Sequence, residues 1–427
     1  MAKIDAAVEQ LTARLGEALG ERLAAAQAGR NREPQALLAA ADELAQLMRK
    51  VAYEALTEAA GRYEEAPLCP GCSRPMERHD RVWRPVLALG GPLRGRFPRF
   101  RCRGCRRGAC PSLERLGLRR GCEPRLVAAA LKLCAHESFE LAEAILAGFG
   151  VSLSDNTLQR LAHEVGSERV KQREAAVAAV MAQGYRNLPG RSAPPRLYIM
   201  VDGFKAKVAK QWREPRCAVI FETPQVGADE RNEPPARERV SVLATLGDCA
   251  TVAAWVTEEV QRRNVAEAAE VILVGDGAPW IWEHVADVLP KWVKRTETLD
   301  WYHLCEHLAL AAEGDAKLLE ELRDRAWVGD TNLLLDQLRA LREAASGERL
   351  RVLTNVLKYV LDHRWRMDYQ NKRADGYHVG SGSVESCCRQ LGNRVKAGGT
   401  NWTARGINAV LHLLADELTD DEVRLAA

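Results

Sequence analysis

Two pairs of closely spaced cysteines constrain the fold of this 427-residue chain more than any other feature. The pairs are Cys69-Pro-Gly-Cys72 and Cys102-Arg-Gly-Cys105. Residues 81–89 and 93–102 alternate in polarity around Gly90-Gly91, which predicts a β-hairpin with a tight turn. Cysteine pairs at the two ends of a hairpin can bring four thiolates to one tetrahedral Zn²⁺. We therefore expect a zinc ribbon in residues 66–122, with one structural zinc ion replacing the core that so small a β unit cannot build.

Other possible zinc ligands lie close to this hairpin. Cys110, Cys122 and His79 could each replace one of the four cysteines, and the alternative to any metal site is a set of unligated thiols in a core. The chain has no apolar stretch of the roughly 20 residues needed to span a membrane, and its start lacks a secretory signal. We therefore expect a cytoplasmic protein whose twelve cysteines are thiols or metal ligands.

Positive charge is concentrated in the same part of the chain. The whole sequence carries a net charge of only +3, but residues 66–125 contain fifteen arginines, no lysine and four acidic residues, a net charge of +11. A basic module inside an otherwise acidic chain indicates a surface that binds nucleic-acid phosphates. The predicted DNA contacts of this module are Arg94, Arg96, Arg99, Arg101, Arg103, Arg106 and Arg107.

A helical segment, residues 123–182, follows the predicted ribbon. Within it, residues 139–147 and 154–165 flank a glycine-containing turn, a spacing that is typical of a helix-turn-helix. Ser154 is a suitable N-cap for the second helix. The side chains expected to face DNA on that helix are Asn156, Gln159 and Arg160. Any two packed helices with a glycine turn have a similar pattern, so the DNA interpretation depends on the neighbouring arginines.

The segments on either side of these modules carry less information. Residues 1–65 predict two amphipathic helices with a break at residues 29–34. They either pack on their own chain or form a dimerisation arm. Residues 183–196 are rich in proline, glycine and arginine and predict a linker.

Residues 197–302 have a different pattern, in which three strands precede a helix and a further strand. The expected strands are 197–201, 217–222, 240–246 and 270–274, with helices at 250–263 and 279–288 and a fifth strand ending near Leu299. This order predicts an RNase H-like α/β core. Residues 303–375 predict an all-α insertion, and residues 376–427 return to the core with two helices. The predicted fold class is a multidomain α+β protein.

Three carboxylates lie where such a core would place functional groups. Asp202 and Asp276 each follow a predicted strand, and Glu385 lies in the first turn of the helix after Gly380-Ser-Gly-Ser383. Carboxylates from two strand ends and one helix can bind two Mg²⁺ or Mn²⁺ ions, which prefer oxygen ligands. Such a pair of ions catalyses phosphodiester displacement without a protein nucleophile. For any single aspartate, a turn or cap role is the alternative.

Further polar residues accompany these three acids. Arg389 and Lys396 return close to the helical face of Glu385, and Arg394 lies on the same helix. They would grip phosphate oxygens or form a solvated salt-bridge face, and we expect Arg394 to contact DNA. His303, in Asp300-Trp-Tyr-His303, and His378 are either core residues or supporting residues of the site.

Several sequence strings resemble the ISKra-four family of bacterial insertion-sequence transposases over about residues 67–415. The strings are VDG at Asp202, VGDGAPWIW around Asp276, LDWYHLCEHL from Leu299, GSGSVES ending at Ser386, VKAGGTNW, CPGC, PSLERLGL and GVSLSDNTL. The resemblance implies a DDE transposase with an RNase H-like core interrupted by a helical insertion. It implies that Asp202, Asp276 and Glu385 are the catalytic triad. Asp300 and His303 resemble the Asp/Cys-x-x-His signature of Mutator-like and IS256-like relatives.

These patterns together predict a bacterial, nucleoid-associated transposase. Its ribbon and helix-turn-helix would bind the terminal inverted repeats of an insertion sequence, and its core would cut double-stranded DNA and join it to target DNA with two Mg²⁺ ions. We expect at least a homodimer on DNA, because two ends must be held together, and no membrane partner. The alternatives are a domesticated DNA-binding regulator that no longer cuts, a structure-specific nuclease, and a zinc-stabilised protein-interaction module.

Overall fold

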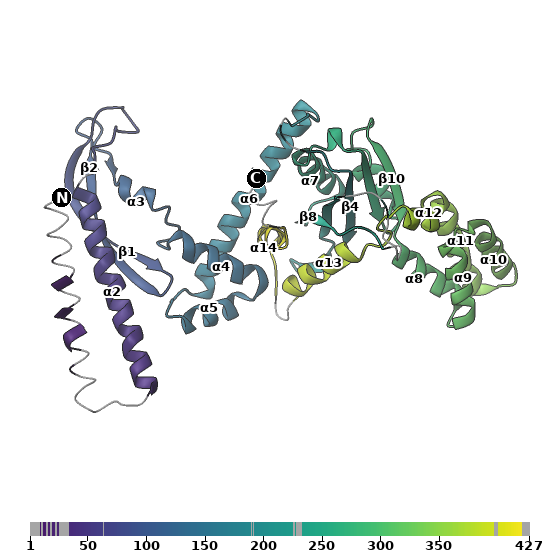
Figure 1. Cartoon of the computed structure of the whole chain (residues 1–427), viewed down its shortest axis with the longest axis horizontal. Helices are drawn as coiled ribbons and strands as arrows, with labels where there is room; N and C mark the ends of the chain where they lie inside the picture. Colours follow the sequence, from purple (N-terminus) through teal and green to yellow (C-terminus); the bar gives the residue numbers. More distant parts are fainter. Residues whose placement is uncertain are drawn as a thin grey trace. The chain divides into compact units, whose positions relative to one another are not determined.

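Two compact units, Met1–Leu161 and Ala162–Ala427, make up the chain and are described separately (Figure 1). The computed structural model describes residues 34–62, 64–188, 190, 192–224, 227, 233–396 and 400–420, with scattered positions between 9 and 24. The first of the two helices predicted within residues 1–65 lies mostly outside the described residues.

A three-stranded antiparallel sheet forms the centre of the first unit. Its strands are β1 (Glu77–Ala88), β2 (Gly91–Arg101) and β3 (Gly108–Ala109), in the order β1-β2-β3. Ala88 pairs with Gly91, so the tight turn is made by Leu89 and Gly90, whose φ of +79° suits glycine. Helix α2 (Pro34–Arg62) packs on β2, where the Arg96 N–H donates to Thr57 Oγ1 at 3.2 Å. This second N-terminal helix therefore packs on its own chain.

Four helices follow the sheet, α3 (Pro111–Arg115), α4 (Pro124–His136), α5 (Phe139–Gly148) and α6 (Asp155–Gln183). Ser138 caps α5, because its Oγ accepts the Leu141 N–H at 3.1 Å. The turn before α6 contains Gly150 at φ +73°, and the Thr157 N–H donates to Ser154 Oγ at 3.3 Å. The helix, turn and cap of the predicted helix-turn-helix segment are therefore present, whereas α6 continues well beyond residue 165.

The division between the units falls inside α6 and not in the predicted linker. Val177, in the second half of α6, joins the core of the second unit, and Arg173 Nη1 bonds Glu258 Oε2 at 2.8 Å. The segment after α6 is also attached, because Tyr185 donates its hydroxyl to the Val288 carbonyl at 2.6 Å. Residues 183–196, which the sequence predicts to be a linker, thus belong to the second unit and contact it.

A five-stranded mixed sheet organises the second unit. Its strands are β4 (Arg196–Gly203), β7 (Arg216–Thr223), β8 (Glu238–Thr245), β9 (Glu270–Gly275) and β10 (Lys294–Leu299), in the order β10-β9-β4-β7-β8. Strand β4 runs parallel to β9 and antiparallel to β7, β7 is antiparallel to β8, and β9 is parallel to β10. Because β4, β9 and β10 run in the same direction, their C-terminal ends lie at one edge of the sheet. A short hairpin, β5 (Ala206–Val208) with β6 (Gln211–Arg213), was not predicted.

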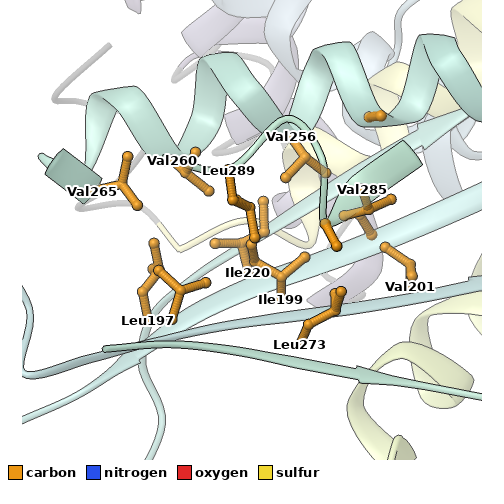
Figure 2. Packing of buried hydrophobic residues seen from close by; sticks show 14 of the residues in the cluster. Leu197, Ile199, Val201, Ile220, Val256, Val260, Val265, Leu273, Val285 and Leu289 are labelled. Atoms are coloured by element: carbon orange, nitrogen blue, oxygen red, sulfur yellow. The ribbon is translucent and has the colours of Figure 1, made fainter. Parts of the chain in front are cut away.

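One face of this sheet is covered by α7 (Cys249–Arg262), with η1 (Val265–Glu267) and η2 (Ile281–Val285) beside it. Alternate residues of β4, Leu197, Ile199 and Val201, meet Val256 and Val260 of α7 in a continuous apolar core (Figure 2). The intervening residues of β4 face the other side, and Asp202 is one of them. Helix α13 (Gly382–Val395) packs on β4 and β7, and α14 (Ala404–Glu417) packs on β8.

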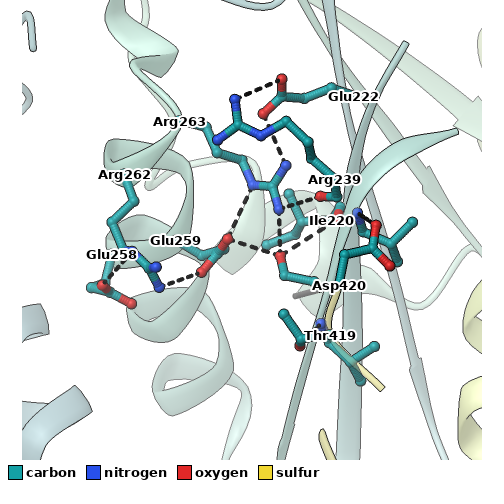
Figure 3. Close-up of polar contacts among 12 residues, drawn as sticks. Ile220, Glu222, Arg239, Glu258, Glu259, Arg262, Arg263, Thr419 and Asp420 are labelled. Carbon is teal, nitrogen blue, oxygen red and sulfur yellow. Dashed lines mark hydrogen bonds and ion pairs between the residues drawn. The ribbon is translucent and has the colours of Figure 1, made fainter. Parts of the chain in front are cut away.

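A buried ion network ties α7 to the end of the sheet. The Arg263 guanidinium is 1% exposed and donates to Glu259 Oε1 at 3.0 Å, to Glu222 Oε1 at 2.9 Å and to the Arg239 carbonyl at 2.6 Å (Figure 3). Burial alone would raise the pKa of Glu259, but Arg263 and Arg262 hold this pKa below its usual value. Every guanidinium nitrogen of Arg263 is therefore used inside the protein.

We expect Arg263→Leu to lower the free energy of unfolding of this unit by about 3–5 kcal/mol, because it leaves two buried carboxylates without their main cation. Urea denaturation followed by circular dichroism measures this loss. Arg339→Leu is the matched control, since Arg339 pairs with Asp336 at 2.7 Å on an exposed helix surface and such pairs contribute less than about 1 kcal/mol. Equal effects of the two substitutions would contradict a stabilising role of the buried network.

A helical module separates β10 from α13. It comprises α8 (Trp301–Ala312), α9 (Ala316–Trp327), α10 (Thr331–Glu343), α11 (Gly347–His363), η3 (Arg364–Arg366) and α12 (Tyr369–Ala374). Its own core includes Leu304, Leu334, Leu353 and Tyr369. The helical stretch predicted at 303–375 is therefore present and starts two residues earlier. Among the described residues, no helix combines the length and the apolar character that crossing a membrane requires.

Candidate functional site

Asp202 ends strand β4 on the edge of the sheet that also carries the ends of β9 and β10. Its Oδ1 accepts the Gly203 N–H at 2.7 Å. Burial raises the pKa of Asp202, and the nearby Asp276 carboxylate adds to the rise. The two acids therefore lie close enough for their charges to interact.

Asp276 follows β9 by one residue. Met200 and Val274 are the last pair in the parallel register of β4 and β9, and Asp202 and Asp276 each follow this pair by two residues. Asp276 Oδ1 accepts the Ala278 N–H at 2.8 Å, and Tyr359 donates its hydroxyl to the Asp276 carbonyl at 2.7 Å. The backbone and α11 together hold this aspartate in place.

Gly277, the residue after Asp276, has a positive φ of +95°. A Cβ at this position would lie 2.8 Å from His363 Nε2 and 2.9 Å from a ring carbon of Tyr359. Only glycine suits both the backbone angle and the space. Helix α11 can therefore approach the end of β9 closely.

Glu385 lies in the first turn of α13, as the sequence predicts, and is half-buried. Ser381 Oγ donates to Glu385 Oε1 at 2.5 Å. Ser381 is the N-cap residue of this helix, but its side chain makes no bond to a helix N–H. Its hydroxyl bonds the carboxylate instead, which fixes the orientation of Glu385.

Glu385 meets two residues that follow β10. One ligand atom from each of Asp300, His303 and Glu385 lies within 4.8 Å of the other two. At this distance, Asp202 and Asp276 do not join the group. Asp202 and Asp276 interact through their charges with each other and with His303, and Glu385 lies beside Asp300 and His303.

His303 connects the two sides electrostatically. Its Nδ1 lies 2.7 Å from Asp300 Oδ2, and this hydrogen bond raises the pKa of His303 to about 9, with the charges of Asp276 and Asp202 adding to the shift against burial. His303 is therefore an imidazolium near neutral pH, and its charge offsets the repulsion among the acids. Of the two interpretations of this histidine, the structure favours a residue of the site.

The other predicted supporting residues have different environments. Arg389 is exposed and Lys396 lies with Nζ 5.8 Å from the Phe204 ring centroid. Arg394 is 5% exposed, and its guanidinium lies over the Trp402 ring, a buried position that does not favour the predicted DNA contact. His378 lies against Tyr198 and Phe221 and bonds the Pro235 carbonyl through Nε2 at 3.0 Å.

An open groove of about 1030 Å³ lies beside the start of α13. It is lined by Ser383 of α13, by Arg389 one turn after Glu385, and by Arg237 and Arg373. Arg237 bonds the Ser383 hydroxyl, and Arg373 lies 3.9 Å from the Trp327 ring centroid. The sequence did not single out Arg237 or Arg373, because only folding brings them to α13.

The four predicted zinc ligands of the first unit converge. Cys69 Sγ lies 3.3 Å from Cys105 Sγ, and Cys72 Sγ lies 3.4 Å from Cys102 Sγ. The Cys105 N–H and neighbouring groups lower the pKa of Cys102 to about 6, which favours the thiolate that binds metal. This Cys₄ group could hold a zinc ion.

The two cysteine turns share one backbone pattern. The Ser73 N–H donates to the Cys69 carbonyl at 2.8 Å, and the Arg106 N–H donates to the Cys102 carbonyl at 3.0 Å. Ser73 and Arg106 both have positive φ, at 55° and 60°. The possible substitutes are not in the cluster: Cys110 donates to the Pro98 carbonyl, Cys122 is buried elsewhere, and His79 faces Asp80.

The predicted DNA contacts of the first unit lie mostly on its surface. Of the seven ribbon arginines, all but the half-buried Arg96 are exposed. Arg99 pairs with Asp80 and Arg103 with Glu77, while Arg101, Arg106 and Arg107 have no ion pair with a described acidic residue. The helix residues Asn156, Gln159 and Arg160 are also exposed.

Comparison with known proteins gives a family but no activity. A family model described as "Uncharacterised protein family (UPF0236)" matches residues 116–425. No curated protein matches the chain. The matched segment begins after the four cysteines. It includes the five residues of the candidate site, which are Asp202, Asp276, Asp300, His303 and Glu385.

Proposed function

The chain belongs to the uncharacterised protein family UPF0236, and we propose that it is an Mg²⁺-dependent DNA transposase with an RNase H-like catalytic core. One observation carries the proposal. Asp202, near the end of β4, and Asp276, directly after β9, lie at the same edge of a sheet ordered β10-β9-β4-β7-β8 and interact through their charges, and Glu385 lies on a helix packed on that sheet. The order of three strands, a helix and a further strand along the chain supports the RNase H-like interpretation.

The donor set fits the proposed metal ions. Asp202, Asp276 and Glu385 offer only carboxylate oxygens, which Mg²⁺ and Mn²⁺ prefer. Two such ions, when bound, activate the attacking oxygen and stabilise the leaving oxygen of a phosphodiester. The backbone N–H groups of Gly203 and Ala278 orient the two aspartates, and Ser381 orients Glu385. His303 supplies a positive charge beside these acids.

The surroundings of the site suit a strand of DNA. The groove beside α13 carries Arg237, Arg373 and Arg389, which are suited to phosphate oxygens. In the first unit, the exposed ribbon arginines would hold phosphates, and Asn156, Gln159 and Arg160 would read bases. The terminal inverted repeats of an insertion sequence are the proposed binding site. Because two ends must be joined, we propose that a dimer or larger assembly acts on DNA.

The test is an end-joining assay. The full chain is incubated with DNA that ends in the terminal repeats flanking its coding sequence, with a supercoiled target plasmid and Mg²⁺. We expect strand cleavage at the repeat ends and their joining to the plasmid, and neither reaction in a chelator. Repeat binding without cleavage would contradict the proposal in favour of a non-cleaving regulator. Cleavage of branched DNA without preference for the repeats or joining would favour a structure-specific nuclease.

DNA binding by the proposed transposase should depend steeply on salt. A surface that neutralises about six phosphates loses ~10³-fold in affinity between 50 and 200 mM salt. We expect replacement of Arg101 and Arg107 by glutamine to reduce the slope of log K against log salt by about 2. Fluorescence anisotropy with labelled duplex DNA measures the slope.

Arg339 and Arg351 provide the control for this measurement. Both pair with acids on their own helices, so their replacement by glutamine should leave the slope unchanged. Affinity that hardly varies with salt would instead favour a zinc-stabilised protein-interaction module.

A further inference from the structure

Asp300 occupies the junction between the sheet and the helical module. It follows β10 directly, its N–H donates to the Gly275 carbonyl at 2.8 Å, and its side chain is fully buried. It also begins α8, because Oδ2 accepts the His303 N–H at 2.9 Å. A buried carboxylate in such a place needs several donors to compensate for the water it has lost.

The donors of Asp300 come from both ends of the helical module. Oδ2 accepts from His303 at the start of the module, and Oδ1 accepts the Ser381 N–H at 2.5 Å, 81 residues further along the chain. A backbone bond reinforces this closure, because the Trp301 N–H donates to the Val379 carbonyl at 3.1 Å. Asp300 therefore joins the end of β10 to the start of α13.

The connection continues from Ser381 to Glu385. The Ser381 hydroxyl donates to Glu385 Oε1 at 2.5 Å, and the Glu385 N–H donates to the Ser381 carbonyl at 3.1 Å. A change in the position of Ser381 must therefore move the carboxylate of Glu385. The chain of bonds runs from the sheet through Asp300 and Ser381 to the third acid of the site.

We infer that Asp300 is a positioning residue that sets Glu385 against Asp202 and Asp276 across the helical module. This role rests on the proposed metal site of these three acids. Three of the acceptor positions of Asp300 are already used by Ser381 and His303, which favours positioning over direct metal binding. An ordinary capping aspartate differs: Asp315 accepts the Leu318 N–H of its own helix, and within the described part of the chain its side chain has no hydrogen bond to a distant segment.

Asp300→Asn tests this role, because the amide offers a donor to either Ser381 or His303 whichever way it is oriented. The full chain is titrated with Mn²⁺ alone and followed by electron paramagnetic resonance. Hydrogen exchange of the peptide that contains Ser381 and Glu385 is measured by mass spectrometry. We expect about a 10–100-fold weaker Mn²⁺ affinity and faster exchange in this peptide, with both Mn²⁺ ions still bound at saturation.

Two variants control the experiment. Asp315→Asn removes a capping carboxylate of the same type and should change neither Mn²⁺ affinity nor exchange at Ser381. Ser381→Ala keeps the N–H that Asp300 binds but removes the hydroxyl on Glu385, so it should weaken Mn²⁺ binding with little change in exchange. If Asp300→Asn fails to fold, as judged by circular dichroism, Ser381→Ala decides: unchanged Mn²⁺ affinity in this variant overturns the inference.

The result that would contradict the positioning role of Asp300 differs from the result that would contradict the proposed metal site. A wild-type chain that binds no Mn²⁺ contradicts the metal site, and the positioning role with it. A wild-type chain that binds two Mn²⁺ ions, with Asp300→Asn unchanged in affinity and exchange, overturns the positioning role alone. If Asp300→Asn loses one Mn²⁺ ion while hydrogen exchange at Ser381 stays normal, Asp300 is a metal ligand. This result would also overturn the positioning role.

Discussion

Asp276→Asn should reduce the rate of DNA strand cleavage by about a thousandfold while leaving the fold intact. Asparagine can still accept the Ala278 N–H through its amide oxygen, and the Tyr359 bond goes to the backbone carbonyl, so the local structure is retained. The substitution removes the negative charge with which Asp276, together with Asp202, would hold a divalent cation. The substitution therefore tests the charge of residue 276 with little change in the shape of its side chain.

The rate is measured in single-turnover assays of strand cleavage and joining in Mg²⁺ and in Mn²⁺, with unfolding temperature and DNA affinity measured in parallel. Asp287→Asn is the matched control, because Asp287 is exposed and pairs with Lys291 at 3.9 Å. It should leave all of these quantities unchanged. Equal rates for the wild-type chain and Asp276→Asn would end the proposal that this site cuts DNA.

The strands around the site could be predicted because their patterns are local. Residues 197–201 and 270–274 are short, mostly apolar runs, followed by Asp202-Gly203 and by Gly275-Asp276-Gly277. Both runs form strands that pair in parallel, so Asp202 and Asp276 lie at the same edge of the sheet. The metal role of these aspartates stays a prediction. The cysteine turns were equally local, and all four cysteines converge as expected.

The rest could not be predicted, because it depends on contacts between distant segments. The bond from Asp300 to Ser381 joins residues on either side of the helical module, and no spacing in the sequence reveals it. Arg394 is a cation on the helix of Glu385, but it is buried beside Trp402. The composition of residues 183–196 indicated a linker, whereas contacts such as that between Arg173 and Glu258 extend the second unit into α6.

The zinc prediction has an effect of a different kind, since it concerns folding. We expect one zinc ion per chain, and we expect Cys102→Ser to lose it and to unfold the β1-β2-β3 sheet. One buried cluster, at the cysteine end of this sheet, consists of Cys69, Met76, Phe100 and Cys102, with Ala109 partly buried against it. Two of its four buried members are proposed zinc ligands, so this cluster is small without the metal. Structural zinc contributes about 10 kcal/mol or more to the folding of comparable small sites.

Metal analysis of the purified chain and the fluorescence of Trp83 in β1 report the loss of zinc and of the sheet. Cys110→Ser is the matched control: this thiol only donates to the Pro98 carbonyl, and its loss should cost about 1 kcal/mol with zinc retained. Because the exposed arginines are carried by the same strands and turns, Cys102→Ser should also abolish DNA binding. Mn²⁺ binding at Asp202 and Asp276 should persist, since these residues belong to the other unit. Retained zinc and fluorescence in Cys102→Ser would mean that the four thiols form a core without metal.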